Sequence, residues 1–361
     1  MVTAASIDVT VTSMEFDVNE IDNMDVQFST NPNVPQLSLG LFHWVHATKV
    51  KFLDMKRQFA NKRQHYMVVN EYSLFIDDDE NGLAPLVKKS FKKDITTTAF
   101  CEVRELCMCT NIINKKSSKA FLLINSDEEI LASVKTISDH KSNRYESVSS
   151  KEIGSSRDVK KVGDGYDVVF AFLPNTGDGI TSEQSSLSNI FVSVNACLSA
   201  QKDAGNAVFE WLEMLTEVSV KLITILKSVY KQVLIIRPLC VPSDCDRKYV
   251  VCIGYIGKNK TKQQTANWLE AVVKNKKYIT NICGENSKND DVRNSITKNN
   301  VMNSNNAFAA MNKMLKFVEE SNFFGGKYGK YREKQISSCI SWKNAFVDGK
   351  TKINVLNSSN E

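Results

Sequence analysis

Aromatic and basic residues alternate near the end of the sequence, in the stretch GGKYGKYREK. It places the two tyrosines Tyr328 and Tyr331 among four basic residues, which are Lys327, Lys330, Arg332 and Lys334. Aromatic rings stack on unpaired bases and cations meet phosphates, so this pattern is typical of a surface that binds single-stranded RNA. Lys327, Tyr328, Tyr331 and Arg332 are therefore candidate RNA-binding residues. A solvated helix with two packing tyrosines has the same composition, and the sequence leaves that alternative open.

The cysteines offer a second chemistry, which is metal binding. There are nine of them, an odd number, and they are scattered along the chain. Cys107 and Cys109 stand close together, but no second pair and no histidine follow at the spacing of a zinc site. The sequence therefore predicts no metal site and reduced thiols in a protein inside the cell.

Composition is ordinary for a globular chain of 361 residues, with 42% hydrophobic and 24% charged residues. The net charge of +5 permits nucleic-acid binding without requiring it. No apolar run is long enough for a transmembrane helix, so no membrane partner is expected. The first residues are acidic and lack the basic start and apolar core of a secretory signal.

Short apolar runs alternate with helical patterns in the middle of the chain. Strands are predicted at AFCEVREL, KAFLLIN, YDVVFAFLP, NAVFEWLEM, KQVLIIRPL and KYVVCIGYI. A helix is expected at residues 42–60, and another before Gly205, which should end it. The last two strands are too close for a crossover helix, so they must be antiparallel. The predicted fold class is α/β, with a mostly parallel Rossmann-like sheet, an antiparallel edge strand and helices on both faces.

Five regions follow from these patterns. Residues 1–36 form an N-terminal extension that is partly disordered, and residues 37–258 form the α/β domain. Residues 259–300 are an Asn/Lys-rich connection, residues 301–346 a helical region that packs on the domain, and residues 347–361 a tail.

The segment from Ala204 to Gly254 has a distinctive order of features. A small residue and a glycine precede a strand, then the helical LTEVSVKLITILKSVY, the strand KQVLIIRP, a short loop and KYVVCIGY. This order resembles the FtsJ/RrmJ-type 2′-O-ribose methyltransferases, most closely the cap-specific mRNA (nucleoside-2′-O-)-methyltransferases. The stretch from MNSNNAFAAMNK to CISW resembles that family's ending, so the likeness spans about residues 42–345. It implies a methyltransferase-type Rossmann sheet, a capped-mRNA substrate and a nuclear location, with the cytoplasm as the alternative.

Members of that family bind S-adenosylmethionine through a glycine-rich turn. The corresponding segment here is EVRELCMCTN, and no glycine remains between Ala99 and Ser118. The degenerate cofactor-binding positions are Glu102, Val103, Arg104, Leu106 and Cys107. Because only glycine lets the backbone approach a ligand so closely, no cofactor is expected. S-adenosylmethionine would be the cofactor if a repacked loop still held it.

The family's catalytic tetrad is Lys–Asp–Lys–Glu, and the resemblance carries it onto altered positions. The first lysine falls on Val50, between Lys49 and Lys51, either of which serves after a register shift. The aspartate falls on Leu173 or Pro174, with Asp178 later in the chain. The central lysine falls on Glu210 and the final glutamate on Arg247. These reversed charges predict a Glu210–Arg247 salt bridge in place of the catalytic pair. In this comparison Lys56 and Arg57 lie close to the family's RNA channel, which makes them further RNA-binding candidates.

The leading hypothesis is a catalytically inactive pseudo-methyltransferase that binds RNA or serves as a subunit beside a protein partner. The first alternative is an active, divergent S-adenosylmethionine-dependent cap 2′-O-methyltransferase that uses Lys49 or Lys51, Asp178 and Glu210. The second alternative is an interaction protein without affinity for RNA.

Overall fold

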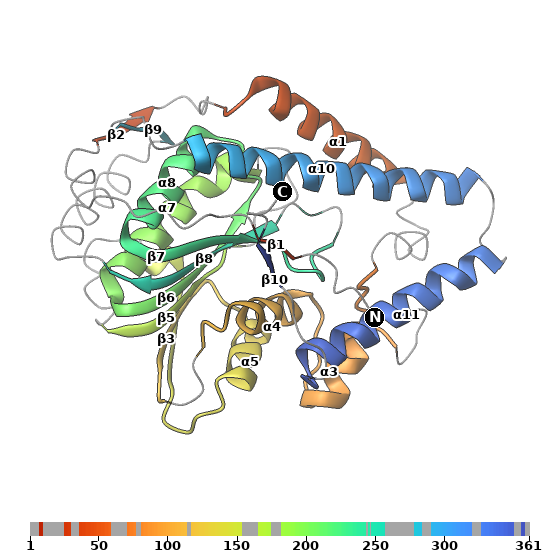
Figure 1. Cartoon of the computed structure of the whole chain (residues 1–361), viewed down its shortest axis with the longest axis horizontal. Coiled ribbons are helices and arrows are strands. Elements are labelled where there is room, and N and C mark those ends of the chain that lie inside the picture. The colour runs from red at the N-terminus through yellow and green to blue at the C-terminus, as the bar shows by residue number, and fades with distance from the viewer. Residues whose placement is uncertain are drawn as a thin grey trace.

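A computed structural model describes residues 7–9, 25–29, 36–58, 71–76, 81–113, 117–153, 165–174, 182–242, 245, 247–256, 278–283, 290–319, 326–349 and 355–357. Six strands form its central sheet in the order β4-β3-β5-β6-β8-β7 (Figure 1). Their bounds are β3 (Ala120–Ile124), β4 (Arg144–Val148), β5 (Tyr166–Ala171), β6 (Gln201–Leu212), β7 (Tyr230–Ile236) and β8 (Arg247–Tyr255).

Strands β4, β3, β5 and β6 are parallel to one another, whereas β8 is antiparallel to both β6 and β7. The predicted fold class is confirmed: the protein has an α/β fold with a Rossmann-like sheet, mostly parallel, with antiparallel pairing at one edge. The antiparallel strand itself lies one place inside that edge, because β8 returns between β6 and β7.

The central strands are buried on both faces because helices cover each side. In β3, Leu122 and Ile124 pack in one core while Phe121 and Leu123 pack in the other, as the alternation of a strand requires. The first core contains α7 (Ser182–Ala200) and α8 (Glu217–Val229), and the second contains α4 (Ala99–Thr110) and α5 (Glu128–Ile137). The short helix α6 (Ser150–Ile153) follows β4.

The strand predicted at AFCEVREL is wrong, because these residues form helix α4. Its apolar residues Ala99, Val103, Leu106 and Cys107 recur at helical spacing and fill one core. Asn111 ends the helix in a left-handed conformation, with φ at 52° and its N–H donating to Cys107 O at 3.0 Å. The first strand of the sheet is therefore β3, and the turn that follows a first strand is at residues 125–127.

Two other sequence predictions also need correction. Strand β4 lies in a polar stretch where the sequence analysis predicts no strand, because an edge strand keeps exposed polar residues such as Arg144. Helix α7 ends at Ala200 rather than at Gly205, which lies within β6. The neighbouring Ala204 adopts a φ of 59°, next to a register irregularity between β5 and β6.

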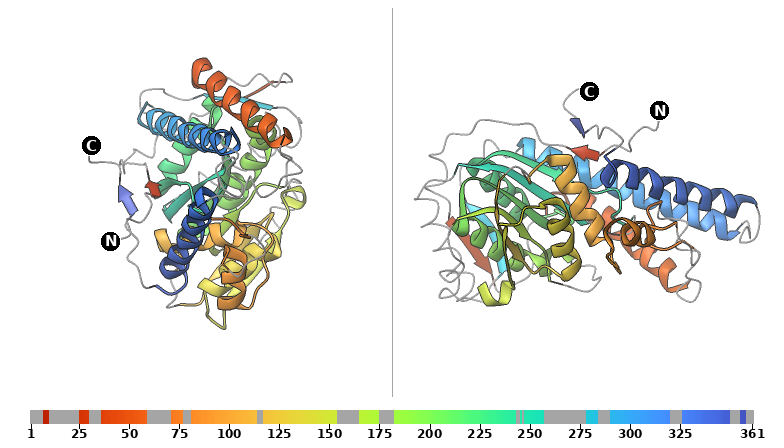
Figure 2. Two further views of the ribbon diagram at one scale, coloured as in Figure 1. Left: turned by 90° about the vertical axis from the view of Figure 1, so that its right-hand side faces the viewer. Right: turned by 90° about the horizontal axis from the view of Figure 1, so that it is seen from below.

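Four longer or peripheral helices surround the sheet. These are α1 (Leu39–Gln58), α3 (Leu83–Phe91), α10 (Asp290–Glu319) and α11 (Gly326–Phe346). Figure 2 shows α10 and α11 extending together beyond the sheet. Helix α10 begins at Asp290, inside the region predicted as a connection, because Val292 and Ile296 are buried against the core and override the low helix propensity of its asparagines.

Short strands involve both ends of the chain. The strand β1 (Ile7–Val9) pairs with β10 (Val355–Asn357), and β2 (Asp25–Ser29) pairs with β9 (Tyr278–Cys283). The division into five regions stays a prediction. Among the described residues, no helix combines the length and the apolar character that crossing a membrane requires.

Candidate functional site

The strand order of the sheet reverses between β3 and β5. The chain leaves β3 toward β4 on one side and leaves β5 toward β6 on the other. In open α/β sheets, ligands bind outside the carboxyl ends of the strands at such a switch point. The crevice between the ends of β3 and β5 is therefore where a nucleotide-like cofactor would bind.

Asn125 spans this crevice with its side chain. Its Nδ2 donates to Phe172 O at 2.8 Å, beyond the end of β5. Its Oδ1 accepts the N–H of Ser150 at 2.7 Å, and its own N–H donates to Val148 O at 2.8 Å. Asn125 has a φ of 53°, a conformation that asparagine tolerates better than most residues. One residue thus joins the carboxyl ends of β3, β4 and β5.

The helix that follows the crevice, α5, begins with the chain's own carboxylates. Asp127 is its N-cap and accepts the N–H of Ile130 at 2.8 Å, with Glu128 and Glu129 in the first turn. A free helix N-terminus attracts anions, but here Asp127 caps the helix and Glu128 and Glu129 add negative charge to its first turn. The turn at residues 125–127 also contains no glycine. These residues do not fit S-adenosylmethionine.

Two of the predicted tetrad positions meet at the same edge of the sheet. Arg247 Nε lies 3.3 Å from Glu210 Oε1, which confirms the predicted ion pair. The two residues share a face because Glu210 pairs with Tyr249, two residues along β8 from Arg247. The Nε–Oε1 contact lacks hydrogen-bond alignment, so the guanidinium needs a further partner.

That partner is Glu102, on the neighbouring helix α4. Arg247 donates through Nη1 to Glu102 Oε2 at 3.2 Å, and Tyr249 donates its hydroxyl to the same oxygen at 2.6 Å. Thr98 donates to the other oxygen. The Glu102 carboxylate is fully buried, so these donors and the cation supply the solvation that water would give it.

The contacts at this edge form one continuous line of side chains. Leu173 N donates to Glu210 Oε2 at 2.9 Å, which connects the end of β5 to β6. Asn125, Glu210, Arg247 and Glu102 thus connect the carboxyl ends of β4, β3, β5 and β6 with the amino end of the antiparallel β8, and the backbone of residues 172–173 links Asn125 to Glu210. We call these four residues the carboxyl-edge network. It occupies with protein side chains the edge at which a Rossmann sheet receives its ligands.

Burial changes the protonation of three carboxyl groups near this edge. Desolvation raises the pKa of Glu210 to about 7, although the charge of Arg247 and the N–H of Leu173 oppose the shift. Desolvation likewise raises the pKa of Glu105 and of Glu183 to about 7, against several hydrogen bonds that favour the ionised form.

We expect the protein to become less stable as the pH rises from about 5 to about 8. The folded-state pKa values near 7 exceed the ordinary value of 4.5, so the folded protein binds more protons between these limits. The stabilisation is full below the ordinary pKa and is lost as the pH passes through the folded-state pKa. The pKa values of Asp167 and Glu129 are lowered, so their protonation destabilises the folded protein only at pH values below this window. Thermal denaturation between pH 5 and 8 measures the slope, and Glu210→Gln should make it shallower. A melting temperature that rises across this window would contradict the assignment.

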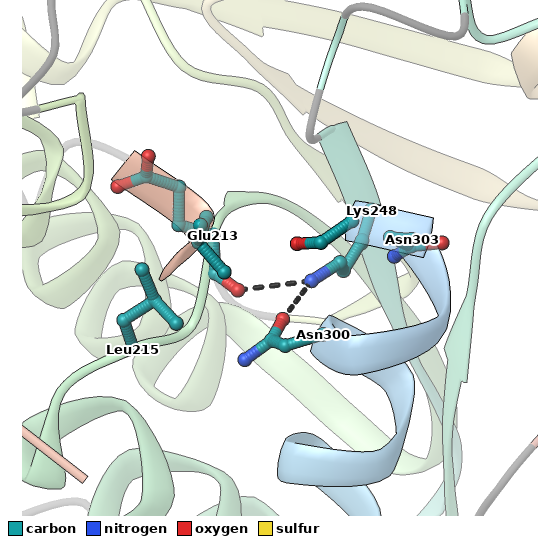
Figure 3. A pocket seen from close by; sticks show the side chains of 7 residues that line it. Glu213, Leu215, Lys248, Asn300 and Asn303 are labelled. Carbon is teal, nitrogen blue, oxygen red and sulfur yellow. Dashed lines mark hydrogen bonds between the residues drawn. The ribbon is translucent and has the colours of Figure 1, made fainter. Parts of the chain in front are cut away.

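A small hollow lies beside the network, between α1, α10 and the end of β6 (Figure 3). Its lining comprises Val45, Glu213, Leu215, Lys248, Asn300, Asn303 and Ser304, which leave no enclosed space for even a water molecule. The hollow is therefore too small for S-adenosylmethionine.

Two lysines make ionic or hydrogen-bonded contacts around the hollow. Lys49, one of the two candidates for the first tetrad lysine, forms an ion pair with Glu213. The buried Lys248 donates to Glu213 O at 2.9 Å and to Asn300 Oδ1, as Figure 3 shows. Glu213 and Met214 both have a left-handed φ, at 61° and 65°. These contacts hold an unfavourable backbone turn, which indicates a structural use of both lysines.

The other predicted catalytic positions are Lys51, Pro174 and Asp178, and the structure does not bring Lys51 or Pro174 into contact with Glu210. Lys51 is exposed on α1, on a different side of the helix from Lys49. Pro174 is half-buried just after β5, where Leu173 rather than Pro174 contacts Glu210. Asp178 lies outside the described residues.

The residues expected to mark a degenerate cofactor turn lie instead on helix α4. Val103, Leu106 and Cys107 are buried in a hydrophobic core. Arg104 donates through Nε to Phe346 O at 2.5 Å, and its guanidinium lies 4.4 Å from the centre of the Phe91 ring. The turn was misplaced because the segment was aligned with a strand. Whether these residues contact a ligand stays a prediction.

The RNA-binding candidates lie on α1 and α11. Arg57 is exposed and forms an ion pair with Asp54 at 3.5 Å. Tyr331 and Arg332 are half-buried on α11. Lys56, Lys327 and Tyr328 are within helices, but their side chains lie outside the described part of the structure. Their contact with RNA stays a prediction.

Sequence reasoning missed Asn125, Glu183 and Lys248. The buried Glu183 accepts from Leu215 N at 2.5 Å, from Thr216 Oγ1 at 2.8 Å and from Ser219 Oγ at 2.5 Å. Asp127 could have been found, because an Asp directly before a helical pattern is an N-cap signal. Within the described ranges, no group of three or more His, Cys, Asp or Glu side chains is arranged to hold a metal ion.

No protein-family model matches the sequence, and no curated protein is significantly similar to it. A Plasmodium falciparum structure described as a ribosomal RNA methyltransferase has 15% identity and a TM-score of 0.35, and covers 45% of this chain and 99% of its own. The Haemonchus contortus phosphoethanolamine N-methyltransferase 2 complex with S-adenosylhomocysteine has 10% identity and a TM-score of 0.28, over 46% of this chain and 44% of its own. Human methyltransferase-like protein 13 with the same ligand has 11% identity and a TM-score of 0.25, over 50% of this chain and 93% of its own. All three are methyltransferases by description, and likenesses this distant assign neither activity nor substrate.

Proposed function

We propose that this protein is a pseudo-methyltransferase, which neither binds S-adenosylmethionine nor transfers methyl groups, and which acts by binding RNA beside a protein partner. The observation that carries the proposal is the carboxyl-edge network. Asn125 joins the strand ends at the switch point, and the Glu210–Arg247–Glu102 contacts continue that line to β8.

The chemistry at this edge also argues against methyl transfer. A 2′-hydroxyl is a weak acid, so its methylation needs a positioned general base, whose loss costs about 10²–10⁴ in rate. Glu210 is engaged by Arg247 and by Leu173 N, and Lys49 by Glu213. Among the described residues at this edge, these groups already have protein partners.

RNA is the proposed partner because of the resemblance to cap 2′-O-methyltransferases and because of the basic residues along α1 and α11. Capped mRNA is the specific RNA that the resemblance favours. A protein partner with methyltransferase activity would supply the chemistry that this chain lacks.

Isothermal titration with S-adenosylmethionine and S-adenosylhomocysteine tests the proposal, together with methyl transfer to capped RNA from a radiolabelled donor. We expect no heat of binding at submillimolar ligand and no transfer under conditions in which an active cap methyltransferase is saturated. Micromolar binding of either ligand, or transfer to a 2′-oxygen, would favour an active, divergent enzyme and overturn the proposal.

The variant Asn125→Gly tests whether the Asn125 side chain is what excludes the cofactor. Asn125→Gly keeps the left-handed backbone at no steric cost but removes the side chain that spans the crevice. If the variant binds S-adenosylhomocysteine and the natural protein does not, Asn125 is the group that closes the crevice. If neither binds, the acidic start of α5 and the rest of the carboxyl-edge network suffice to exclude the ligand.

A further inference from the structure

The two edges of the central sheet differ in what lies beside them. Strand β7 forms one edge, and the N-terminal strand β1 is in contact with it. Strand β4 forms the other edge, and within the described residues it pairs with β3 alone. An edge strand with an unpaired side presents backbone N–H and C=O groups to which another chain can bond. The outer side of β4 is therefore a candidate interaction surface.

The pairing of β4 with β3 determines which backbone groups point outward. Arg144 N donates to Lys119 O, on the β3 side, at 3.0 Å. In a parallel ladder every second residue bonds to the same neighbouring strand, so the backbone of Glu146 also faces β3. The backbone N–H and C=O groups of Tyr145 and Ser147 therefore point away from the sheet. Ser147 is exposed, so the outer side of β4 is open to solvent at this residue.

Strand β4 lacks most of the features that protect an edge strand from pairing. It contains neither proline nor lysine, and its register with β3 runs from Arg144 to Val148 without a bulge. Its two charged residues, Arg144 and Glu146, have opposite signs, so the strand has no net charge with which to repel a second copy. Its one protective feature is its length of five residues, which makes pairing at this edge weak and reversible.

The two charged side chains lie on the same face of β4, because they are two residues apart. Both contact Tyr166 of β5: the Arg144 guanidinium lies 5.0 Å from the centre of the ring, and the Tyr166 hydroxyl donates to Glu146. Among the described residues, neither Arg144 nor Glu146 forms an ion pair. The ring thus holds one positive and one negative group at the edge of the sheet, and neither charge is balanced by an ion pair there.

We propose that β4 pairs antiparallel with β4 of a second copy of this chain, so that the two six-stranded sheets join across a two-fold axis. This inference goes beyond the proposed function and depends on neither RNA binding nor cofactor binding. When the axis passes through Tyr145, the outward backbone groups of the two strands bond to each other. In this register Arg144 of each copy lies opposite Glu146 of the other, which gives two equivalent cross-strand ion pairs.

The charges also select this register and this partner. If the axis passed through Glu146 instead, the two Glu146 carboxylates would lie opposite each other, and like charges at such positions are destabilising. A strand from an unrelated protein need not have charges of the right sign at the right spacing. A second copy has them by symmetry, because the position two residues from Arg144 is Glu146. The charge complementarity therefore favours a homodimer.

Sedimentation velocity of the full chain at increasing concentration measures the association. A pair of short strands buries less area than a permanent dimer needs, so we expect a reversible dimer with a Kd of about 10–100 μM. Hydrogen exchange resolved to single residues tests the register. The amides of Tyr145 and Ser147 should exchange more slowly as the protein concentration rises through the Kd. The amide of Glu146 already faces β3 and should exchange at a rate that does not depend on concentration.

Ser147→Pro separates dimerisation from folding. Proline removes an N–H group that points away from β3, and edge strands accept proline at such positions, so the variant should fold and remain monomeric.

Charge variants test the cross-strand ion pairs. Glu146→Arg places arginine opposite arginine at both symmetric positions and should weaken the dimer about tenfold or more. The exchanged variant Arg144→Glu/Glu146→Arg restores opposite charges at both positions, and its Kd should return to within about threefold of that of the natural protein. The matched control Glu333→Arg reverses the same charge at an exposed position of α11 and should change the Kd by less than about twofold. Circular dichroism shows whether each variant is folded.

Four results would overturn the proposal. A chain that stays monomeric at concentrations about tenfold above the expected Kd does not pair through β4. A dimer that persists in folded Ser147→Pro uses another surface. A dimer that Glu146→Arg weakens and the exchanged variant does not restore lacks the cross-strand ion pairs. Slow exchange of the Tyr145 and Ser147 amides in the monomer would mean that another segment of the same chain covers β4.

Discussion

Replacing Arg247 with leucine is expected to lower the free energy of unfolding by about 3–5 kcal/mol. The guanidinium is the cation shared by Glu102, which is fully buried, and by Glu210, whose side chain is 12% exposed. Without it, the fully buried Glu102 keeps only neutral donors, which do not balance a buried charge, and Glu210 loses the charge that opposes its desolvation. Chemical denaturation followed by circular dichroism measures the loss.

The matched control is Arg57→Leu, which removes an arginine with an 81% exposed side chain and its ion pair with Asp54. Exposed pairs contribute about 0–1 kcal/mol, so this variant should unfold almost as the natural protein does. A change below about 1 kcal/mol for Arg247→Leu would show that the carboxylates are solvated by some other means.

A triple variant that removes all three charges of the network keeps the prediction testable if Arg247→Leu fails to fold. Glu102→Gln/Glu210→Gln/Arg247→Leu removes the cation and both carboxylates, so no buried charge is left unpaired. Replacing all members of a buried ion network by uncharged groups often changes the free energy of unfolding little. We expect this variant to recover most of the stability that Arg247→Leu loses.

The ion pair of Glu210 with Arg247 could be predicted from sequence because the resemblance places both residues, with reversed charges, at two positions of one catalytic tetrad. Once β6 and β8 are recognised as strands, their pairing leaves little freedom, and Glu210 and Arg247 fall as diagonal neighbours on one face. The third member of the network, Glu102, was assigned to the wrong kind of element. Its segment has apolar residues at helical spacing, which predicts a helix. The resemblance to the methyltransferase family placed a strand there instead, against that local pattern.

The closure of the crevice could not be predicted in the same way. Asn125 contacts Ser150 and Phe172, which are 25 and 47 positions away in sequence. Nothing in a single sequence reports which distant carbonyl an asparagine meets. The same holds for Glu183, whose hydrogen-bond donors are more than 30 positions away. Strand β4 was missed for another reason: an edge strand with polar side chains lacks the apolar run that identifies the central strands.

Glu105→Ala is expected to release helix α11 from the domain, with a loss of about 3–5 kcal/mol in the free energy of unfolding. The buried Glu105 carboxylate accepts Trp342 Nε1 at 2.7 Å, Leu239 N at 2.6 Å and Cys240 N at 3.1 Å. An alanine leaves three buried donors without that acceptor, at about 1–3 kcal/mol each before relaxation. Glu128→Ala, which removes an exposed glutamate from α5, is the control and should have little effect.

Limited proteolysis distinguishes local release of α11 from general unfolding. Glu105→Ala should expose the segment at residues 326–346 to cleavage at denaturant concentrations where the sheet remains intact.

Trp342→Phe separates the hydrogen bond from the packing, because it removes the indole N–H and keeps an aromatic ring in the cluster with Phe346 and Cys339. We expect it to cost about 1–2 kcal/mol, less than Glu105→Ala, because the two backbone donors keep their acceptor. Equal losses in both variants would instead mean that the indole packing, and not the carboxylate, holds α11 against α4.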